Sequence, residues 1–285
     1  MLLRSLPVAL DDLLEQNAIL PVCPAVFIRL TQAINAPDDH QSELAEILSS
    51  DPGLTSRVLH VANSALYGMP RQVRSINEAI LRVGIREIWS IASALQAKSL
   101  FKTEGGWTAL NRLLWEHALR TAAVSRTLLQ HLAVTGADET FTAALLHDLG
   151  KSVLQAFEPQ YALLCQNGAL AGRELTFIEA DFFGIDHAQL GGQILLHWNL
   201  PESLATLVAG HHADLRSGVS KASPTLLLAL SNELAHAMTD VNSEGREAIR
   251  KTVSCRLLDA AQLNPESCVG LTAEAQRQFE ALSNA

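Results

Sequence analysis

The chain has 285 residues, 48% of them hydrophobic, and a formal net charge of −9 at pH 7. This apolar content excludes a disordered chain, and an acidic balance with dispersed Lys and Arg disfavours non-specific binding to nucleic acid. Every apolar run is interrupted before it reaches the length of a membrane span, and the N-terminal one meets Asp11 and Asp12 too early for a signal peptide. The four cysteines are scattered and form no CxxC pair, which suits a reducing compartment, so we expect a cytoplasmic protein.

The spacing of apolar residues is helical along nearly the whole chain. Aromatic residues make up only 5%, Leu and Ala are abundant, and no segment keeps the alternation of a strand. These features predict an all-α, multi-helix fold. The break at KTEGG, residues 102–106, divides it into an N-terminal helical part (1–102), a second helical bundle (103–240) and peripheral C-terminal helices (241–285).

The first half begins with three predicted helices. Apolar stripes indicate helices over 24–35 and 42–49. Asp51 before Pro52 is a helix-start signal, because Asp accepts the free amides of the first turn and Pro loses nothing there. We expect this third helix to run as far as Gly68.

Two more helices precede the break. Ser75 and Glu78 are spaced as a capping box at the start of the fourth. The segment over 85–101 is apolar nearly all round, which predicts a helix buried between the two halves; a groove for a partner is the alternative. Asn63 and Ser64 are interpreted as residues that terminate backbone groups inside the bundle.

Helical patterns resume after the break and continue to the C-terminus. The clearest exposed loop is expected at 213–224. The predicted helices cover 108–133, 138–157, 158–168, 174–183, 187–197, 201–212, 224–240, 244–262 and 272–282.

The pair His147-Asp148 carries the strongest chemical signal. It follows four small or apolar residues in TAALLHDLGKSVL, residues 142–154. A histidine and a carboxylate at the end of such a run are costly to bury unless they are paired, hydrogen-bonded or bound to a metal. Lys151 lies one helical turn beyond His147, and Gly150 allows another backbone or a ligand to approach closely.

Four more histidines stand next to apolar helical patterns. They are His117, His187, His211 and His212. Neutral imidazoles with one carboxylate form a set of ligands that suits Fe, Mn, Zn or Ni better than Mg or Ca. Such an ion could lower the pKa of a bound water molecule and generate a hydroxide nucleophile.

The motif HDLGK, with a histidine upstream and others downstream, resembles the HD superfamily of metal-dependent phosphohydrolases. The resemblance implies an HD-like helical bundle in which His117, His147 and Asp148 match the first ligand positions. It also implies that His187, His211 and His212 match the additional ligands of two-metal members, such as the HD-GYP cyclic-dinucleotide phosphodiesterases.

The N-terminal half is similar to a narrower group, the HDOD family of bacterial signalling output domains. The resemblance covers about residues 18–235. The motifs that carry it are LPVCP at 20–24, DPGLT at 51–55, ANSALYG at 62–68 and INEAILRVG at 76–84.

Two departures from the HD pattern bear on activity. The final aspartate of that pattern falls near Asn232, which is neutral, and the segment after His212 has no Glu next to the doublet and no Tyr for a Gly-Tyr-Pro loop. The resemblance therefore implies a signalling module, non-enzymatic or weakly enzymatic, that acts on protein partners. The alternatives are a phosphohydrolase of nucleotides or cyclic dinucleotides, with Asp148 and Lys151 as catalytic residues, and a sensor of a small ligand. A homo-oligomer is compatible with each.

Each candidate also has a purely structural interpretation. The pair His147-Asp148 could be hydrogen-bonded without any ion, and Lys151 could be a simple ion-pair partner. His117 and His187 could be residues near helix starts, and one member of the later doublet could cap a helix C-terminus. The remaining histidines are interpreted as ordinary residues: His40, His60, His131, His197 and His236.

Overall fold

The computed structural model describes residues 20–33, 40–68, 71–102, 106–134, 139–166, 173–212, 220, 223–239 and 246–284. Helices make up the regular structure of these ranges, and no strand occurs in them. The all-α prediction is therefore confirmed. Most of the expected loop at 213–224 and the centre of the expected break at 102–106 lie outside the described residues.

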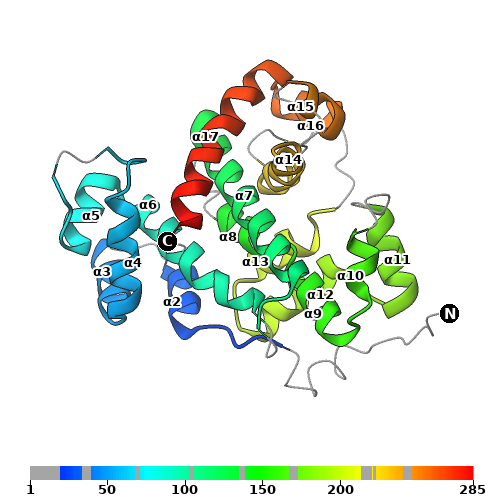
Figure 1. The fold of residues 1–285 in the computed structure, drawn as a ribbon, viewed down its shortest axis with the longest axis horizontal. Coiled ribbons are helices and arrows are strands. Elements are labelled where there is room, and N and C mark those ends of the chain that lie inside the picture. The colour runs from blue at the N-terminus through cyan, green and yellow to red at the C-terminus, as the bar shows by residue number, and fades with distance from the viewer. Residues whose placement is uncertain are drawn as a thin grey trace.

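Six short helices build the N-terminal part, which lies to the left in Figure 1. They are α2 (Ala25–Ala33), α3 (His40–Ser49), α4 (Pro52–Ala62), α5 (Ile76–Val83), α6 (Ile85–Ala97) and the 3₁₀ helix η1 (Lys98–Phe101). The Asp51 side chain accepts a hydrogen bond from Leu54 N at 2.9 Å, as expected of an N-cap. The capping box is only half formed: Ser75 accepts from Glu78 N, but the Glu78 carboxylate accepts from Arg74 N instead of Ser75 N.

The α4 helix ends earlier than expected, at Ala62 rather than near Gly68. The cause is Asn63, whose amide replaces backbone partners on both sides. Its Nδ2 donates to Leu59 O and Val73 O, and its Oδ1 accepts from Val73 N at 2.7 Å. Asn63 thus ties the end of α4 to the chain before α5, which is the structural role predicted for it.

Eleven helices follow, and two of the expected ones are each divided in two. The segment 138–157 breaks at His147-Asp148, and 244–262 breaks near Ser254. The helices are α7 (Ala109–His131), α8 (Glu139–Leu146), α9 (Leu149–Phe157), α10 (Tyr161–Gln166), α11 (Arg173–Phe183), α12 (His187–His197), α13 (Glu202–Ala209), α14 (Pro224–Ala237), α15 (Arg246–Thr252), α16 (Cys255–Ala261) and α17 (Pro265–Ser283).

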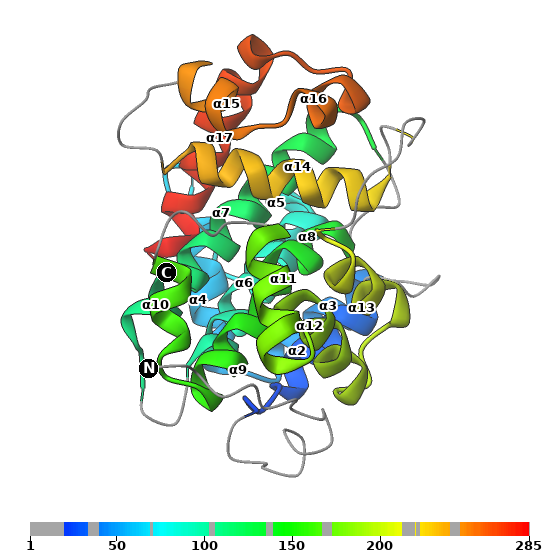
Figure 2. The same ribbon diagram turned by 90° about the vertical axis from the view of Figure 1, so that its right-hand side faces the viewer.

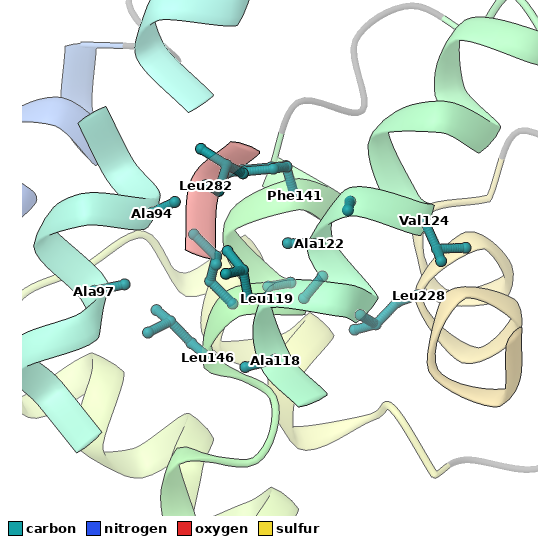
Figure 3. Close-up of a cluster of buried hydrophobic side chains, with 14 of the residues drawn as sticks. Ala94, Ala97, Ala118, Leu119, Ala122, Val124, Phe141, Leu146, Leu228 and Leu282 are labelled. Atoms are coloured by element: carbon teal, nitrogen blue, oxygen red, sulfur yellow. The ribbon is translucent and has the colours of Figure 1, made fainter. Parts of the chain in front are cut away.

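The long helix α7 is the centre of the second half. It packs against α8, α9, α14 and α17. Figure 2 shows α14–α17 at one end of the molecule, α7 and α8 in the middle, and α9 and α12 toward the other end. Side chains from α6, α7, α8, α14 and α17 meet in this core (Figure 3), among them Ala97, Leu119, Phe141, Leu228 and Leu282.

Helix α6 joins the two halves. It contacts α2, α4 and α5 on one side and α8 and α17 on the other. Ile88, Ile91 and Ala92 are fully buried, and Trp89 is 3% exposed. The Trp89 ring donates its N–H to Leu30 O at 2.7 Å and meets Phe141 edge to face. The burial predicted for this segment is confirmed.

Within the described ranges, none of the helices combines the length and the apolarity that crossing a bilayer requires.

Candidate metal centre

His117 lies in the third turn of α7, not at its start as the sequence suggested. Its Nε2 is 2.8 Å from Oδ1 of Asn232, which projects from the middle of α14. Asn232 is buried because α14 is apolar on most sides and packs on α7. The two helices thereby place an imidazole and a neutral amide at one wall of the site.

His147 and Asp148 occupy the turn between α8 and α9. Both are buried, with exposed fractions of 0% and 2%. His147 Nδ1 lies 2.9 Å from Ala144 O, so Nδ1 carries the proton and donates to that carbonyl. The opposite nitrogen, Nε2, is left with its lone pair facing the site. The helix break exists at this place because it turns both polar side chains inward.

Small residues bring the other walls close to this turn. A Cβ atom placed on Gly150 would lie 2.1 Å from His187 O, so α9 and the start of α12 touch through backbone atoms. A Cβ on Gly192 would lie 2.8 Å from Ala205 O, so α12 and α13 also pack closely. Only Gly permits these approaches.

His187 is the first residue of α12, after Asp186 as N-cap. It is fully buried, and its Nδ1 lies 2.6 Å from Oε2 of Glu179 in α11. The same carboxylate oxygen accepts the backbone N–H of His187 at 2.9 Å. His187 Nε2 therefore points away from Glu179, and it lies 3.1 Å from Nε2 of His212.

The doublet follows α13 directly. His211 Nδ1 lies 2.7 Å from Val208 O, so this histidine also keeps its Nε2 free to face the site. The rings of His211 and His212 are 4.0 Å apart. His211 is 3% exposed, whereas His212 is half-buried. Both members of the doublet are thus part of the cluster, and neither is a simple helix cap pointing to solvent.

Asp148 lies at the centre of the cluster. Its Oδ1 is 3.4 Å from His187 Nε2 and 3.8 Å from His211 Nε2, while its Oδ2 is 3.5 Å from His147 Nε2. Lys151 pairs with both oxygens of the same carboxylate, with Nζ 2.8 Å from Oδ1 and 2.9 Å from Oδ2. This ion pair is compatible with the structural and with the catalytic interpretation of Lys151.

Burial and neighbouring charges keep the imidazoles of the cluster neutral and its carboxylate ionised. Burial acts against the charge of Asp148, but His147, Lys151 and His187 together hold its pKa well below the usual value. Burial lowers the pKa of His117 and His211 well below 6.5 and that of His212 to about 3. At neutral pH these three imidazoles are uncharged, which is the form that binds metal.

Two groups of side chains have ligand atoms close enough to share an ion: His117, His147 and Asp148 form one, and His187, His211 and His212 the other. Two buried ligand atoms, His147 Nε2 and His211 Nε2, have no hydrogen-bond partner, whereas Asp148 Oδ1 is in ion-pair contact with Lys151. Unpartnered buried polar atoms are rare unless a water or an ion completes them. The six side chains therefore fit a divalent ion with nitrogen and oxygen ligands, although their role as ligands stays a prediction.

Two residues were not recognised from the sequence as part of this site. Glu179 lies in an ordinary amphipathic segment, eight residues before His187, and nothing in the spacing marks it as buried. His236, interpreted as an ordinary residue, stacks on His117 with ring centroids 4.2 Å apart. Its position one turn after Asn232 on α14 was the only available signal.

The fold and the site define an all-α protein with clustered histidines around one aspartate. The HDOD domain family matches residues 20–214, and the chain belongs to this family. An HDOD domain protein of unknown function from Geobacter sulfurreducens has the same fold, with a TM-score of 0.75, 22% identity, and coverage of 96% of this chain and 97% of that one.

Three further proteins are similar. A candidate phosphohydrolase from Shewanella amazonensis has a TM-score of 0.69 and 20% identity, over 95% of this chain and 97% of that one. A candidate signal transduction protein from Marinobacter aquaeolei has a TM-score of 0.66 and 21% identity, over 95% and 61%. An uncharacterised protein from Treponema pallidum is 26% identical over 68% of this chain, which spans only 37% of that relative's length.

Proposed function

We propose that this HDOD protein is a signalling module whose histidine cluster binds one divalent ion and relays its state to protein partners, with little or no hydrolytic activity. The observation that carries the proposal is Asn232 Oδ1, 2.8 Å from His117 Nε2. A neutral amide occupies the place where the HD pattern has a carboxylate. Asp148 is then the only carboxylate in the two candidate ligand groups of the described residues.

Charge decides how much metal such a cluster holds. Two divalent ions bring four positive charges, and two carboxylates, Asp148 and Glu179 behind His187, offset two of them at most. Lys151, 2.8 Å from Asp148, adds a further positive charge. One ion, with Asp148 and neutral imidazoles as ligands, is the arrangement that this donor set supports, and Fe, Mn, Zn or Ni are the ions that prefer it. When bound, such an ion would lower the pKa of a water molecule bound to it.

A phosphohydrolase acting on a nucleotide or a cyclic dinucleotide is the second candidate. It is favoured by the presence of ligand groups on both sides of Asp148 and by the buried atoms that lack partners. In that case Lys151, half-buried beside Asp148, is the candidate to stabilise negative charge on a phosphate. The neutral Asn232 weighs against it, because loss of a ligand charge weakens ion binding.

Protein partners are supported by two observations. The Marinobacter relative of the same fold is named as a candidate signal transduction protein. The net charge of −9 disfavours nucleic acid as the binding partner. A reducing, cytoplasmic setting is proposed because all four cysteines, Cys23, Cys165, Cys255 and Cys268, are free thiols.

Elemental analysis of tag-free protein purified anaerobically tests the metal. We expect one equivalent of a transition metal per chain in the parent and in His197→Ala, whose side chain is exposed on α12. We expect none in His147→Ala. Equal metal content in all three proteins would overturn the assignment of the cluster.

An activity assay then separates the two candidate functions. The metal-loaded protein is incubated with Mn or Fe(II) and with cyclic dinucleotides or ordinary nucleotides, beside His147→Ala. We expect no turnover in either. Robust turnover that disappears in His147→Ala would replace the signalling module with the phosphohydrolase, whereas equal turnover in both would indicate a contaminating enzyme.

A further inference from the structure

Glu179 is the most completely buried acidic residue near the cluster, and the proposed ligands do not include it. Its exposed fraction is 0%, and it belongs to α11. One carboxylate oxygen, Oε2, accepts both the N–H of the His187 backbone at 2.9 Å and the ring Nδ1–H at 2.6 Å. The other, Oε1, accepts from the hydroxyl of Tyr161 in α10. All hydrogen-bonding atoms of this carboxylate are therefore engaged.

The arrangement fixes one tautomer of His187. A carboxylate at Nδ1 requires the ring proton to be there, so Nε2 carries only a lone pair. That lone pair faces the cluster, 3.1 Å from His212 Nε2 and 3.4 Å from Asp148 Oδ1. A buried carboxylate behind a ligating histidine orients the ring and makes the nitrogen on its far side more basic.

We propose that Glu179 is a positioning residue: it holds His187 in the metal-binding tautomer and, with Tyr161, couples metal occupancy to helices α10 and α11. This inference rests on the proposed metal centre. The chain Tyr161–Glu179–His187 runs without interruption from α10 to the cluster, and all three side chains are fully buried. The two helices lie at the outer edge of the molecule, next to α9 and α12 (Figure 1).

The coupling has a physical basis in the geometry of the start of α12. One oxygen of Glu179, Oε2, accepts hydrogen bonds from both the backbone N–H and the ring N–H of His187. If ion binding turns the ring, the ring must move this carboxylate; if the carboxylate stays in place, it limits how far the ring can turn. Tyr161 then transmits that restraint to α10. Burial and the neighbouring Glu179 raise the pKa of Tyr161 well above its usual value, which keeps its hydroxyl protonated as the donor.

The first experiment measures zinc affinity by calorimetry in three forms of the full chain. Glu179→Met removes the acceptor at nearly constant volume, and we expect zinc affinity to fall by about 10- to 100-fold. Glu179→Gln keeps an oxygen that can accept from Nδ1 but removes the charge, so we expect a smaller loss. A Glu179→Met protein that is folded and binds zinc as tightly as the parent overturns the inference.

The second experiment reads the tautomer itself. Nitrogen-15 spectra of labelled histidines, assigned with His187→Gln, should show His187 protonated at Nδ1 in the metal-free parent. An Nε2–H tautomer in the parent overturns the inference even if no variant folds. Because this measurement needs no metal, it also separates the two proposals: a parent that binds no zinc refutes the metal centre, and the tautomer still decides the role of Glu179.

The third experiment tests the coupling, with a matched control. The chain has two tyrosines, and each donates its hydroxyl to a glutamate: Tyr161 to Glu179, and Tyr67 to Glu87 in the N-terminal half. We expect zinc to slow hydrogen exchange in α10 and α11 of the parent and of Tyr67→Phe, but not of Tyr161→Phe or Glu179→Met. Unchanged exchange in the parent, or the same slowing in Tyr161→Phe, refutes the coupling.

Discussion

His117 and Asn232 meet across α7 and α14, with Nε2 and Oδ1 2.8 Å apart, so the side chain beside this imidazole is a neutral amide. Stacking of His236 on His117 leaves that ring little freedom to move away. An Asp at position 232 would fill nearly the same space as Asn232. It would also add one negative charge to the proposed ligand set.

Asn232→Asp is expected to tighten metal binding. The new carboxylate has nearly the same shape as the amide and adds one negative charge 2.8 Å from His117 Nε2. We expect at least a tenfold lower Kd for Zn or Mn, measured by calorimetry, since about 1.4 kcal/mol corresponds to a factor of ten. Asn77→Asp, exposed on α5 and outside the two candidate ligand groups, serves as control. Equal affinities in parent and Asn232→Asp would contradict the charge argument.

The metal-free protein is expected to lose stability as the pH falls from 6.5 toward 4. Burial lowers the pKa of His212 to about 3 and that of His236 to about 4, against 6.5 in an unfolded chain. The unfolded chain therefore takes up protons in this range that the folded protein does not, so the free energy of unfolding decreases as the pH falls. Asp148 adds to the loss as the pH approaches 4, because its pKa in the folded protein lies well below 3.8 and the unfolded chain takes up a proton there first.

Thermal unfolding in EDTA between pH 7.5 and 4.5 measures this effect. We expect the midpoint to change little above pH 7 and to fall below it, and His212→Gln to flatten part of the slope. Added zinc should steepen the dependence, because protons then compete with the ion for the same nitrogens. A midpoint that stays constant from pH 7 to pH 5 would show that the cluster histidines are not held neutral.

Gly150→Ala is expected to disrupt the site without replacing any proposed ligand. The added methyl would lie 2.1 Å from His187 O, and the neighbour is backbone that cannot rotate away. We expect a loss of about 1–3 kcal/mol or more from overpacking, together with weaker zinc binding because the start of α12 must move. Gly270→Ala in α17 is the matched control: nothing lies within 4 Å of the added Cβ, and removing a helical glycine should stabilise by about 0.5–1 kcal/mol. Urea unfolding of both variants measures the difference.

Much of this site could be anticipated because its residues interrupt apolar helical patterns. His147 and Asp148 stand out in the sequence as polar residues at the end of a buried run, and the structure buries them to 0% and 2%. The turn that holds them was missed, since the helical spacing continues from Leu146 to Leu149 and Val153 across it. Periodicity detects which face is buried, but it does not detect a change of direction that keeps the same face buried.

Glu179 was missed for a different reason. An acidic residue in an amphipathic helix is usually on the solvent side, and only the fold places this one against the start of α12. Its partners, Tyr161 and His187, lie 18 and 8 residues away in the chain. A carboxylate whose partners come from other helices has no local signature, so residues that orient a ligand are harder to predict than the ligands themselves.

The last prediction concerns the two halves of the chain, which we expect to fold together. The Trp89 ring of α6 meets Phe141 of α8 at 5.9 Å between centroids, and Ala97 and Leu146 belong to the same buried cluster (Figure 3). Removing residues 1–106 would expose this surface of α8 and the neighbouring part of α17, so a fragment of 107–285 should be insoluble or molten, with dye binding and no cooperative unfolding. Trp89→Ala in the full chain should cost about 3–5 kcal/mol, because it leaves a cavity and an unpaired Leu30 carbonyl. Trp107→Ala, outside that contact and half-buried, should cost much less. A monomeric 107–285 fragment with a cooperative melt would show that the second bundle is an independent domain.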